Sequence, residues 1–141
     1  MGNISHKKER EYGRLFAELL RDRDNLFVVS SDFCHWGGHF DYAPYEKGAG
    51  TVNEFIEKLD KEGMGLIEQH DGGAFHKYLE ETGNTVCGRH PIAVLLAAIE
   101  ECAGDTPMKT RFVRYAQSGE VKKRSDSSVS YASSYTVLAD A

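Results

Sequence analysis

Residues 28–37, VVSSDFCHWG, end an apolar stretch with acidic, thiol, imidazole and indole side chains. Imidazole exchanges protons near neutral pH and binds iron, copper or zinc, so His35 is the candidate catalytic residue. Asp32 could orient that imidazole, and Trp36 could provide a stacking wall for a ligand. The structural alternatives are a hydrogen-bonded histidine, a turn aspartate and a core tryptophan.

A second cluster, NTVCGRHP at residues 84–91, comes directly before an apolar run that predicts a helix. The partial positive charge of a helix N-terminus and the neighbouring Arg89 would both favour the thiolate of Cys87, the form that reacts and binds metals. Arg89 could also clamp a carboxylate or a phosphate. A packed, buried cysteine and a surface arginine are the alternatives. The two clusters together predict one site containing His35, Trp36, Cys87 and Arg89.

The other cysteines and histidines suggest less chemistry. A closed zinc site could be made from Cys34, His39, Cys87 and His90, but their spacing does not repeat in the paired arrangement of structural zinc modules. We expect Cys34 to be buried filler and Cys102 to be structural. His90 is expected to cap the helix or to bond locally.

The elements that must position these side chains follow from apolar periodicity and turn residues. The expected helices and strands are a helix at 8–22, a strand at 25–31 covered on both faces, an irregular loop at 37–50, helices at 52–67 and around 75–79, a buried helix at 92–99 with Pro91 in its first turn, and strands at 110–117 and 128–138. Gly83 should end the helix before it. We expect the serine-rich stretch 125–134 to form an ordinary edge strand rather than a phosphorylatable loop.

Composition limits the class of protein. The 141 residues, 40% of them hydrophobic, suit a single domain, residues 1–141. A net charge of −5 argues against general nucleic-acid binding, and no apolar run approaches the roughly 18–20 residues that span a bilayer. Three irregularly spaced cysteines fit a reducing compartment. We therefore expect a soluble, cytoplasmic protein.

Several uncommon strings occur in one order: SSDFCHWG, EKLDKEGMGLIEQHD, NTVCGRHPIAVLL, RYAQS and DSSVSYAS. Together they resemble the Memo family, whose name refers to cell motility driven by an ErbB-type receptor tyrosine kinase, and the resemblance covers residues 8–138. It implies an α/β fold, a partial sheet flanked by helices, similar to class III non-haem iron extradiol dioxygenases. It also implies a cytoplasmic location that can extend to the nucleus.

The resemblance assigns roles to two residues of this chain. His35 matches a family histidine, and Cys87 the family cysteine, that are associated with binding a phosphotyrosine peptide from a receptor tail. Cys87 also matches a ligand of iron or copper. The two family histidines that complete the metal site lie in an N-terminal half that has no counterpart here, so the implied metal site is partial. Without that half, apolar edges and faces of the sheet should be left uncovered.

Two functional hypotheses follow. The favoured one is a Memo-like signalling adaptor that links an ErbB-type receptor tyrosine kinase to the microtubule and actin cytoskeleton, through a pocket that binds a phosphorylated receptor peptide. The alternative is an iron- or copper-dependent oxidoreductase, impaired in this chain, in which Cys87 binds the metal and His35 acts as a base or hydrogen-bond donor. A truncated chain without independent activity is a third possibility.

Overall fold

The computed structural model describes residues 3–46, 48, 50–104, 106–123 and 125–139. In chain order, the elements found there are α1 (His6–Arg21), β1 (His35–Trp36), the 3-10 helix η1 (Gly38–Phe40), α2 (Val52–Glu68), α3 (Gly72–Thr82), α4 (Arg89–Cys102), β2 (Met108–Gln117) and β3 (Ser128–Leu138). The fold is α/β, as predicted, and the helices and the two C-terminal strands lie close to their expected positions.

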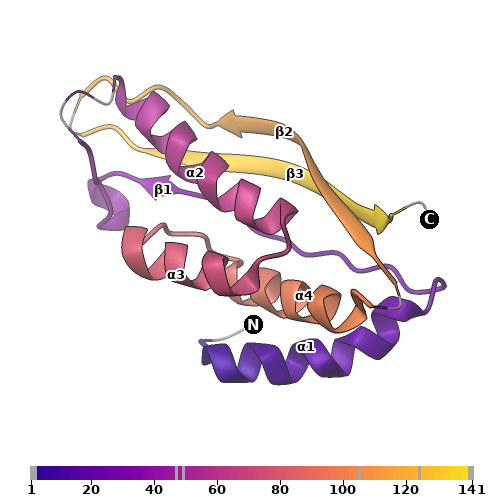
Figure 1. The fold of residues 1–141 in the computed structure, drawn as a ribbon. Coiled ribbons are helices and arrows are strands. Elements are labelled where there is room, and N and C mark those ends of the chain that lie inside the picture. The colour runs from indigo at the N-terminus through magenta and orange to yellow at the C-terminus, as the bar shows by residue number, and fades with distance from the viewer. Residues whose placement is uncertain (1–2, 47, 49, 105, 124, 140–141) are drawn as a thin grey trace.

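The strands form one antiparallel sheet in the order β1-β3-β2. Figure 1 shows α2 lying along this sheet, α3 and α4 side by side next to it, and α1 packed on α4 at the edge of the molecule. The expectation of an edge strand for the serine-rich stretch is wrong. β3 is the central strand because it pairs with β2 along its length and with β1 at His35 and Trp36.

Local signals explain where the helices begin and end. Thr51 caps α2 through a reciprocal pair of bonds: its hydroxyl accepts from the Glu54 N–H, and the Glu54 carboxylate accepts from the Thr51 N–H. Asp71 caps α3 by accepting from the Ala74 N–H at 2.8 Å. Gly83 ends α3 in the left-handed conformation, with φ of 64°, which confirms its predicted role.

The prediction of a strand at residues 25–31 is wrong. That segment is extended but has no strand partner among the described residues, and Leu26 and Val28 are 88% and 82% exposed. Its apolar run lacks the two covering layers that a buried strand requires. Within the sheet itself, Val113 of β2 and Val137 of β3 are 60% and 50% exposed, which agrees with the expectation that apolar faces of the sheet would be left uncovered. Regular pairing with the sheet begins only near Phe33, whose N–H donates to the Ser130 carbonyl.

The core lies between the sheet and the inner faces of α2, α3 and α4, where Ile56, Phe75 and Leu96 are almost completely buried. Cys34 and Cys102 have no exposed surface, which confirms that both are structural. Burial raises the pKa of the Cys34 thiol to about 12. Across the described ranges, every helix is too short or too polar to cross a membrane.

Candidate functional site

The segment before α4 lies directly against the segment before β1. Ser31 Oγ accepts from the Gly88 N–H at 2.8 Å, and the Asp32 N–H donates to Cys87 Sγ at 3.2 Å. A Cβ added to Gly88 would overlap the Ser31 side chain, so this close approach requires glycine. The geometry therefore places the exposed Cys87 beside Asp32, although the two residues are 55 positions apart in the chain.

His35 is held by backbone oxygens on one side of its ring. Nδ1 donates to the carbonyls of Phe33 and Thr85 at 3.0 and 3.1 Å, which leaves the lone pair on Nε2. Nε2 lies 3.7 Å from Asp32 Oδ2. The His35 backbone is fixed too, because its N–H donates to Thr85 Oγ1 at 2.7 Å and its carbonyl accepts from the same hydroxyl.

Asp32 is thus the common neighbour of the predicted thiol and the predicted imidazole. Its backbone contacts Cys87, and its half-exposed carboxylate faces His35. We call these three residues the Cys87–Asp32–His35 cluster. The N–H donated to Cys87 Sγ fixes the position of the thiol, and the Asp32 carboxylate can orient the imidazole ring. The cluster therefore presents a thiol and an imidazole on either side of Asp32.

The structure places Trp36 and Arg89 away from this cluster. Trp36 is 5% exposed within the core, and its Nε1 donates to the Pro44 carbonyl. Arg89 is the first residue of α4, two residues after Cys87, but its guanidinium donates to Asn3 Oδ1 and lines a groove between α1, α3 and α4. The four residues expected in one pocket therefore divide into a His35–Cys87 pair, the core residue Trp36, and Arg89 in a separate groove.

The structure does not bring together the four residues of the closed zinc site that was considered from the sequence. Cys34 is enclosed in the core, and His39 is exposed on η1. The expectation that His90 bonds locally is wrong: its Nδ1 donates to Glu9 Oε1 at 2.6 Å, 81 residues away. Tertiary packing of α1 on α4 brings this pair together, which local sequence cannot indicate.

The donor atoms of the Cys87–Asp32–His35 cluster do not fit an iron or copper ion as they stand. Within the described ranges, only His6, Glu9 and His76 bring three potential ligand atoms within 4.8 Å of one another. Cys87 Sγ is instead bonded to a backbone N–H, and His35 offers one ring nitrogen. Stable metal binding requires several ligands to be assembled together.

A buried carboxylate that sequence reasoning missed supports both halves of the cluster. Asp60 of α2 has no exposed surface and accepts from the Cys34 N–H at 3.2 Å and from Asn84 Nδ2 at 3.0 Å. Cys34 directly precedes His35, and Asn84 lies three residues before Cys87. The spacing of Asp60 from Ile56 and Met64, four residues on either side, places it on the buried face of the helix and could have indicated its role.

Comparison with known proteins identifies relatives across almost the whole chain. The family model described as Memo-like protein matches residues 1–135. Protein MEMO1 of Xenopus tropicalis is 50% identical over 139 residues, which make up 98% of this chain and 47% of that protein. Human Protein MEMO1 is 51% identical over 133 residues, 94% of this chain and 45% of that protein.

A more distant relative, the Protein memo-1 homolog of Caenorhabditis elegans, is 43% identical over 136 residues. Those residues make up 94% of this chain and 39% of the nematode protein. The chain thus spans less than half the length of the curated relatives it matches. The order of the quoted strings, the α/β fold and these matches agree, so the chain belongs to the Memo family.

Proposed function

We propose that this chain acts as a Memo-type signalling adaptor in the cytoplasm. It would bind a phosphotyrosine peptide from the tail of an ErbB-type receptor tyrosine kinase and relay the signal to proteins of the microtubule and actin cytoskeleton. Its family membership supports this proposal. The observation that carries it is the convergence of Cys87 and His35 on Asp32 at an exposed surface.

The chemistry of the cluster bears on how a phosphopeptide would bind there. Cys87 lies at the N-terminal end of α4, where the helix dipole favours a bound anion. The negative charge of Asp32 would repel a phosphate, so the contact between Asp32 and His35 affects how a phosphopeptide binds. A proton on His35 Nε2 would compensate the carboxylate and supply a donor to the ligand. We therefore expect binding of the peptide to require both the imidazole of His35 and the thiol of Cys87.

Replacing either residue should weaken recognition of the phosphopeptide. We expect His35→Ala and Cys87→Ala each to weaken binding of a fluorescent phosphotyrosine peptide about tenfold or more, because each loses one charge-assisted or polar contact of about 1.5–3 kcal/mol. Fluorescence anisotropy with the phosphorylated peptide and its unphosphorylated counterpart measures the effect.

His39→Ala is the matched control for this experiment, since His39 is exposed on η1 and lies outside the cluster. It should bind the phosphopeptide as the wild type does. Unchanged affinity in both His35→Ala and Cys87→Ala would exclude the cluster as the peptide site. Equal affinity for the phosphorylated and unphosphorylated peptides would exclude phosphotyrosine as its ligand.

A second candidate function is an iron- or copper-dependent oxidoreductase. The observation that favours it is the position of Cys87, whose sulfur is a potential metal ligand, on an exposed surface close to Asp32. Metal analysis after anaerobic purification tests it. We expect less than one iron or copper per chain, since the cluster does not assemble three ligands. A full equivalent of iron that is lost in Cys87→Ala would instead establish the oxidoreductase as the better proposal.

A further inference from the structure

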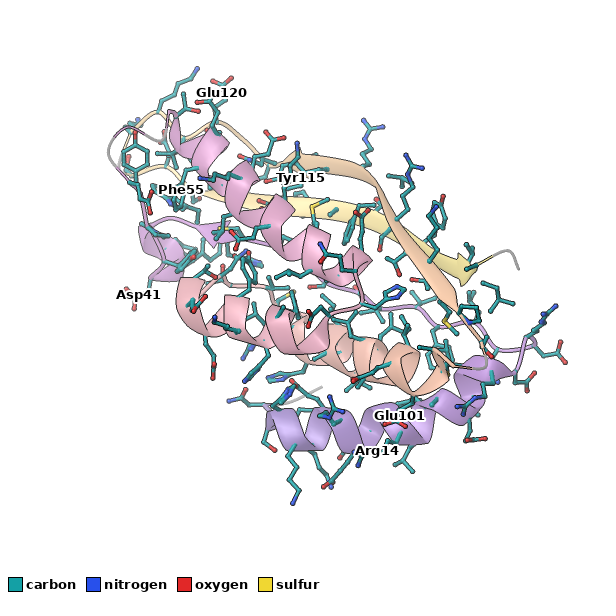
Figure 2. All side chains as sticks on the ribbon, viewed as in Figure 1. Arg14, Asp41, Phe55, Glu101, Tyr115 and Glu120 are labelled. Carbon is teal, nitrogen blue, oxygen red and sulfur yellow. The ribbon has the colours of Figure 1, made fainter. Side chains whose placement is uncertain are left out.

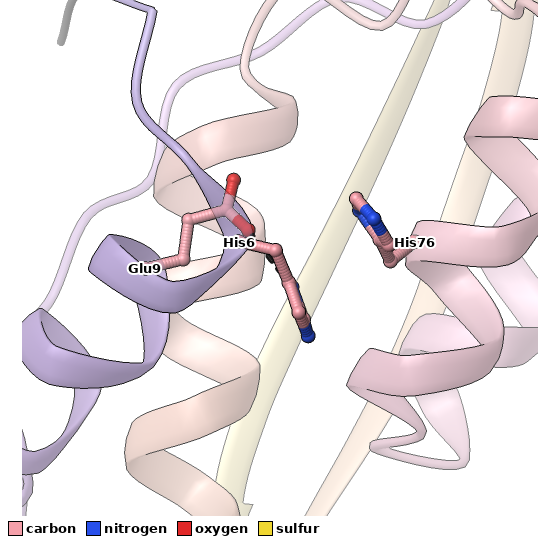
Figure 3. Close-up of side chains that lie close together, drawn as sticks. All are labelled: His6, Glu9 and His76. Atoms are coloured by element: carbon pink, nitrogen blue, oxygen red, sulfur yellow. Dashed lines mark hydrogen bonds and ion pairs between the residues drawn. The ribbon is translucent and has the colours of Figure 1, made fainter.

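A group of metal-binding side chains lies where α1 approaches α3, in the groove that Arg89 and His90 also line. His6 and Glu9 are three residues apart, so they share one face of the first turn of α1. His76 faces them from α3 (Figure 3). One potential ligand atom of each residue lies within 4.8 Å of the others. Helix packing thus assembles two imidazoles and a carboxylate from segments 70 residues apart.

The geometry of the pair on α1 suits a small cation. His6 Nδ1 lies 3.2 Å from Glu9 Oε2. Ligand bonds of about 2.0–2.1 Å at tetrahedral angles place neighbouring ligand atoms about 3.3 Å apart. The His6 to Glu9 distance already has this value. A cation can therefore replace the proton that the two atoms share, without movement of the helix backbone.

The carboxylate of the group is buried and positioned by another residue. Glu9 is 5% exposed, and its second oxygen accepts from His90 Nδ1 at 2.6 Å. His90 in turn contacts Asn3 Oδ1 through Nε2. A buried carboxylate requires a positive or donating partner, and hydrogen bonds to its other oxygen fix its orientation, as in many metal sites. His90 therefore positions Glu9 and leaves Oε2 facing His6 and His76.

His76 has the outer contact that metal-bound histidines commonly make. Its Nε2 lies 3.3 Å from Glu80 Oε1, one turn further along α3. With Nε2 facing Glu80, Nδ1 is the ring nitrogen that an ion would bind. The rings of His6 and His76 are stacked with centroids 4.4 Å apart. Rotation of the partly exposed His76 ring would direct one of its nitrogens toward an ion held by His6 and Glu9.

We propose that His6, Glu9 and His76 form a binding site for a divalent transition-metal ion of the zinc class. Two imidazole nitrogens and one carboxylate oxygen form a ligand set that zinc prefers, whereas magnesium and calcium favour oxygen ligands alone. The site opens into a groove of about 360 Å³ that is also lined by Arg89 and His90. The groove leaves a fourth coordination position open to water, and a bound ion would link α1 to α3.

Titration of the chain with Zn²⁺ by isothermal calorimetry tests this site. The Cys87→Ser variant is used as the background, so that the thiol of the other cluster cannot contribute. We expect one Zn²⁺ to bind per chain. His76→Ala in the same background should weaken binding by more than about 10–100-fold, the usual loss for removing an outer contact, because it removes a ligand. His76 is partly exposed, so the variant keeps its core.

His39→Ala in the same background is the control, and it should bind Zn²⁺ normally. Zn²⁺ should raise the melting temperature of this control and leave that of His76→Ala unchanged, because only a native-state ligand stabilises the fold. Unchanged Zn²⁺ affinity in His76→Ala, or binding present in the wild type and absent from the Cys87→Ser background, would overturn the proposal. Peptide affinity is measured separately, so failure here does not affect the adaptor proposal.

Discussion

Replacing Asp60 with alanine is expected to lower the free energy of unfolding by about 3–5 kcal/mol, because it removes the acceptor at the centre of a buried network. Asp60 accepts from the Cys34 N–H, from Asn84 Nδ2 and, at 2.9 Å, from the Tyr115 hydroxyl of β2. Figure 2 labels Tyr115 on the strand beside α2. The substitution removes the acceptor of the Cys34 N–H, and it takes one of two acceptors each from Asn84 and Tyr115, which keep bonds to the Tyr78 and Ser130 hydroxyls. Chemical denaturation measures the loss.

The charge of Asp60 also gives this effect a pH dependence. Burial raises the pKa of its carboxyl above the ordinary value, while hydrogen bonds from Ser130, Asn84 and Tyr115 oppose the shift. Between the unfolded and folded pKa values, the folded chain holds a proton that the unfolded chain has lost. Stability therefore falls as pH rises from about 4 through the folded pKa, and this contribution should vanish in Asp60→Asn.

Asp24→Ala is the matched control, since Asp24 is exposed in the segment after α1 and its loss should change stability by less than about 0.5 kcal/mol. An Asp60→Ala variant within about 1 kcal/mol of the wild type would show that the network does not carry the stability assigned to it. A variant that unfolds at room temperature would agree with the prediction. Asp60→Asn, which keeps an acceptor oxygen, should then fold and provide the pH series.

The network explains which parts of the site the sequence could predict. Residue types identified His35 and Cys87, because few side chains exchange protons or bind metals near neutral pH. Whether these two side chains lie close together depends on Asp60 and Thr85, whose hydrogen bonds join segments about 25–50 residues apart in the chain. No local pattern encodes such bonds. Arg89 lies beside Cys87 in sequence, yet the turn of the helix directs it to the α1 groove.

The same distinction applies to the fold. Helices α1, α2 and α4 follow from apolar spacing, since one helix buries one stripe of residues. The segment 25–31 has the composition of a buried strand, but composition cannot supply the neighbours that a strand pairs with. The central position of β3 was missed for a related reason: polar serines suggested an edge. Ser128 and Ser130 are in fact buried in the sheet, where Ser130 accepts from Tyr115.

Gly13→Ala is expected to destabilise the chain by about 1–3 kcal/mol, although alanine is the better helix former. Gly13 is buried where α1 crosses α4. A Cβ added there would overlap the Cβ of Ala97 and lie 2.9–3.0 Å from the backbone of Ala97 and Ala98. The helices must separate to admit it. Figure 2 shows the Arg14 to Glu101 ion pair that bridges these helices beside the crossing, and separation would stretch it as well.

Gly65→Ala provides a control with the opposite expected sign. Gly65 lies in α2 with no heavy atom within 4 Å of an added Cβ, so alanine should stabilise the chain by about 0.5–1 kcal/mol through helix propensity alone. Thermal unfolding of the two variants separates propensity from packing. If Gly13→Ala were also stabilising, this would contradict the inference that α1 and α4 approach too closely at Gly13 to admit a methyl group. Ala97→Gly added to Gly13→Ala should recover only part of the loss, because it removes the overlapping methyl group but leaves the two backbone contacts.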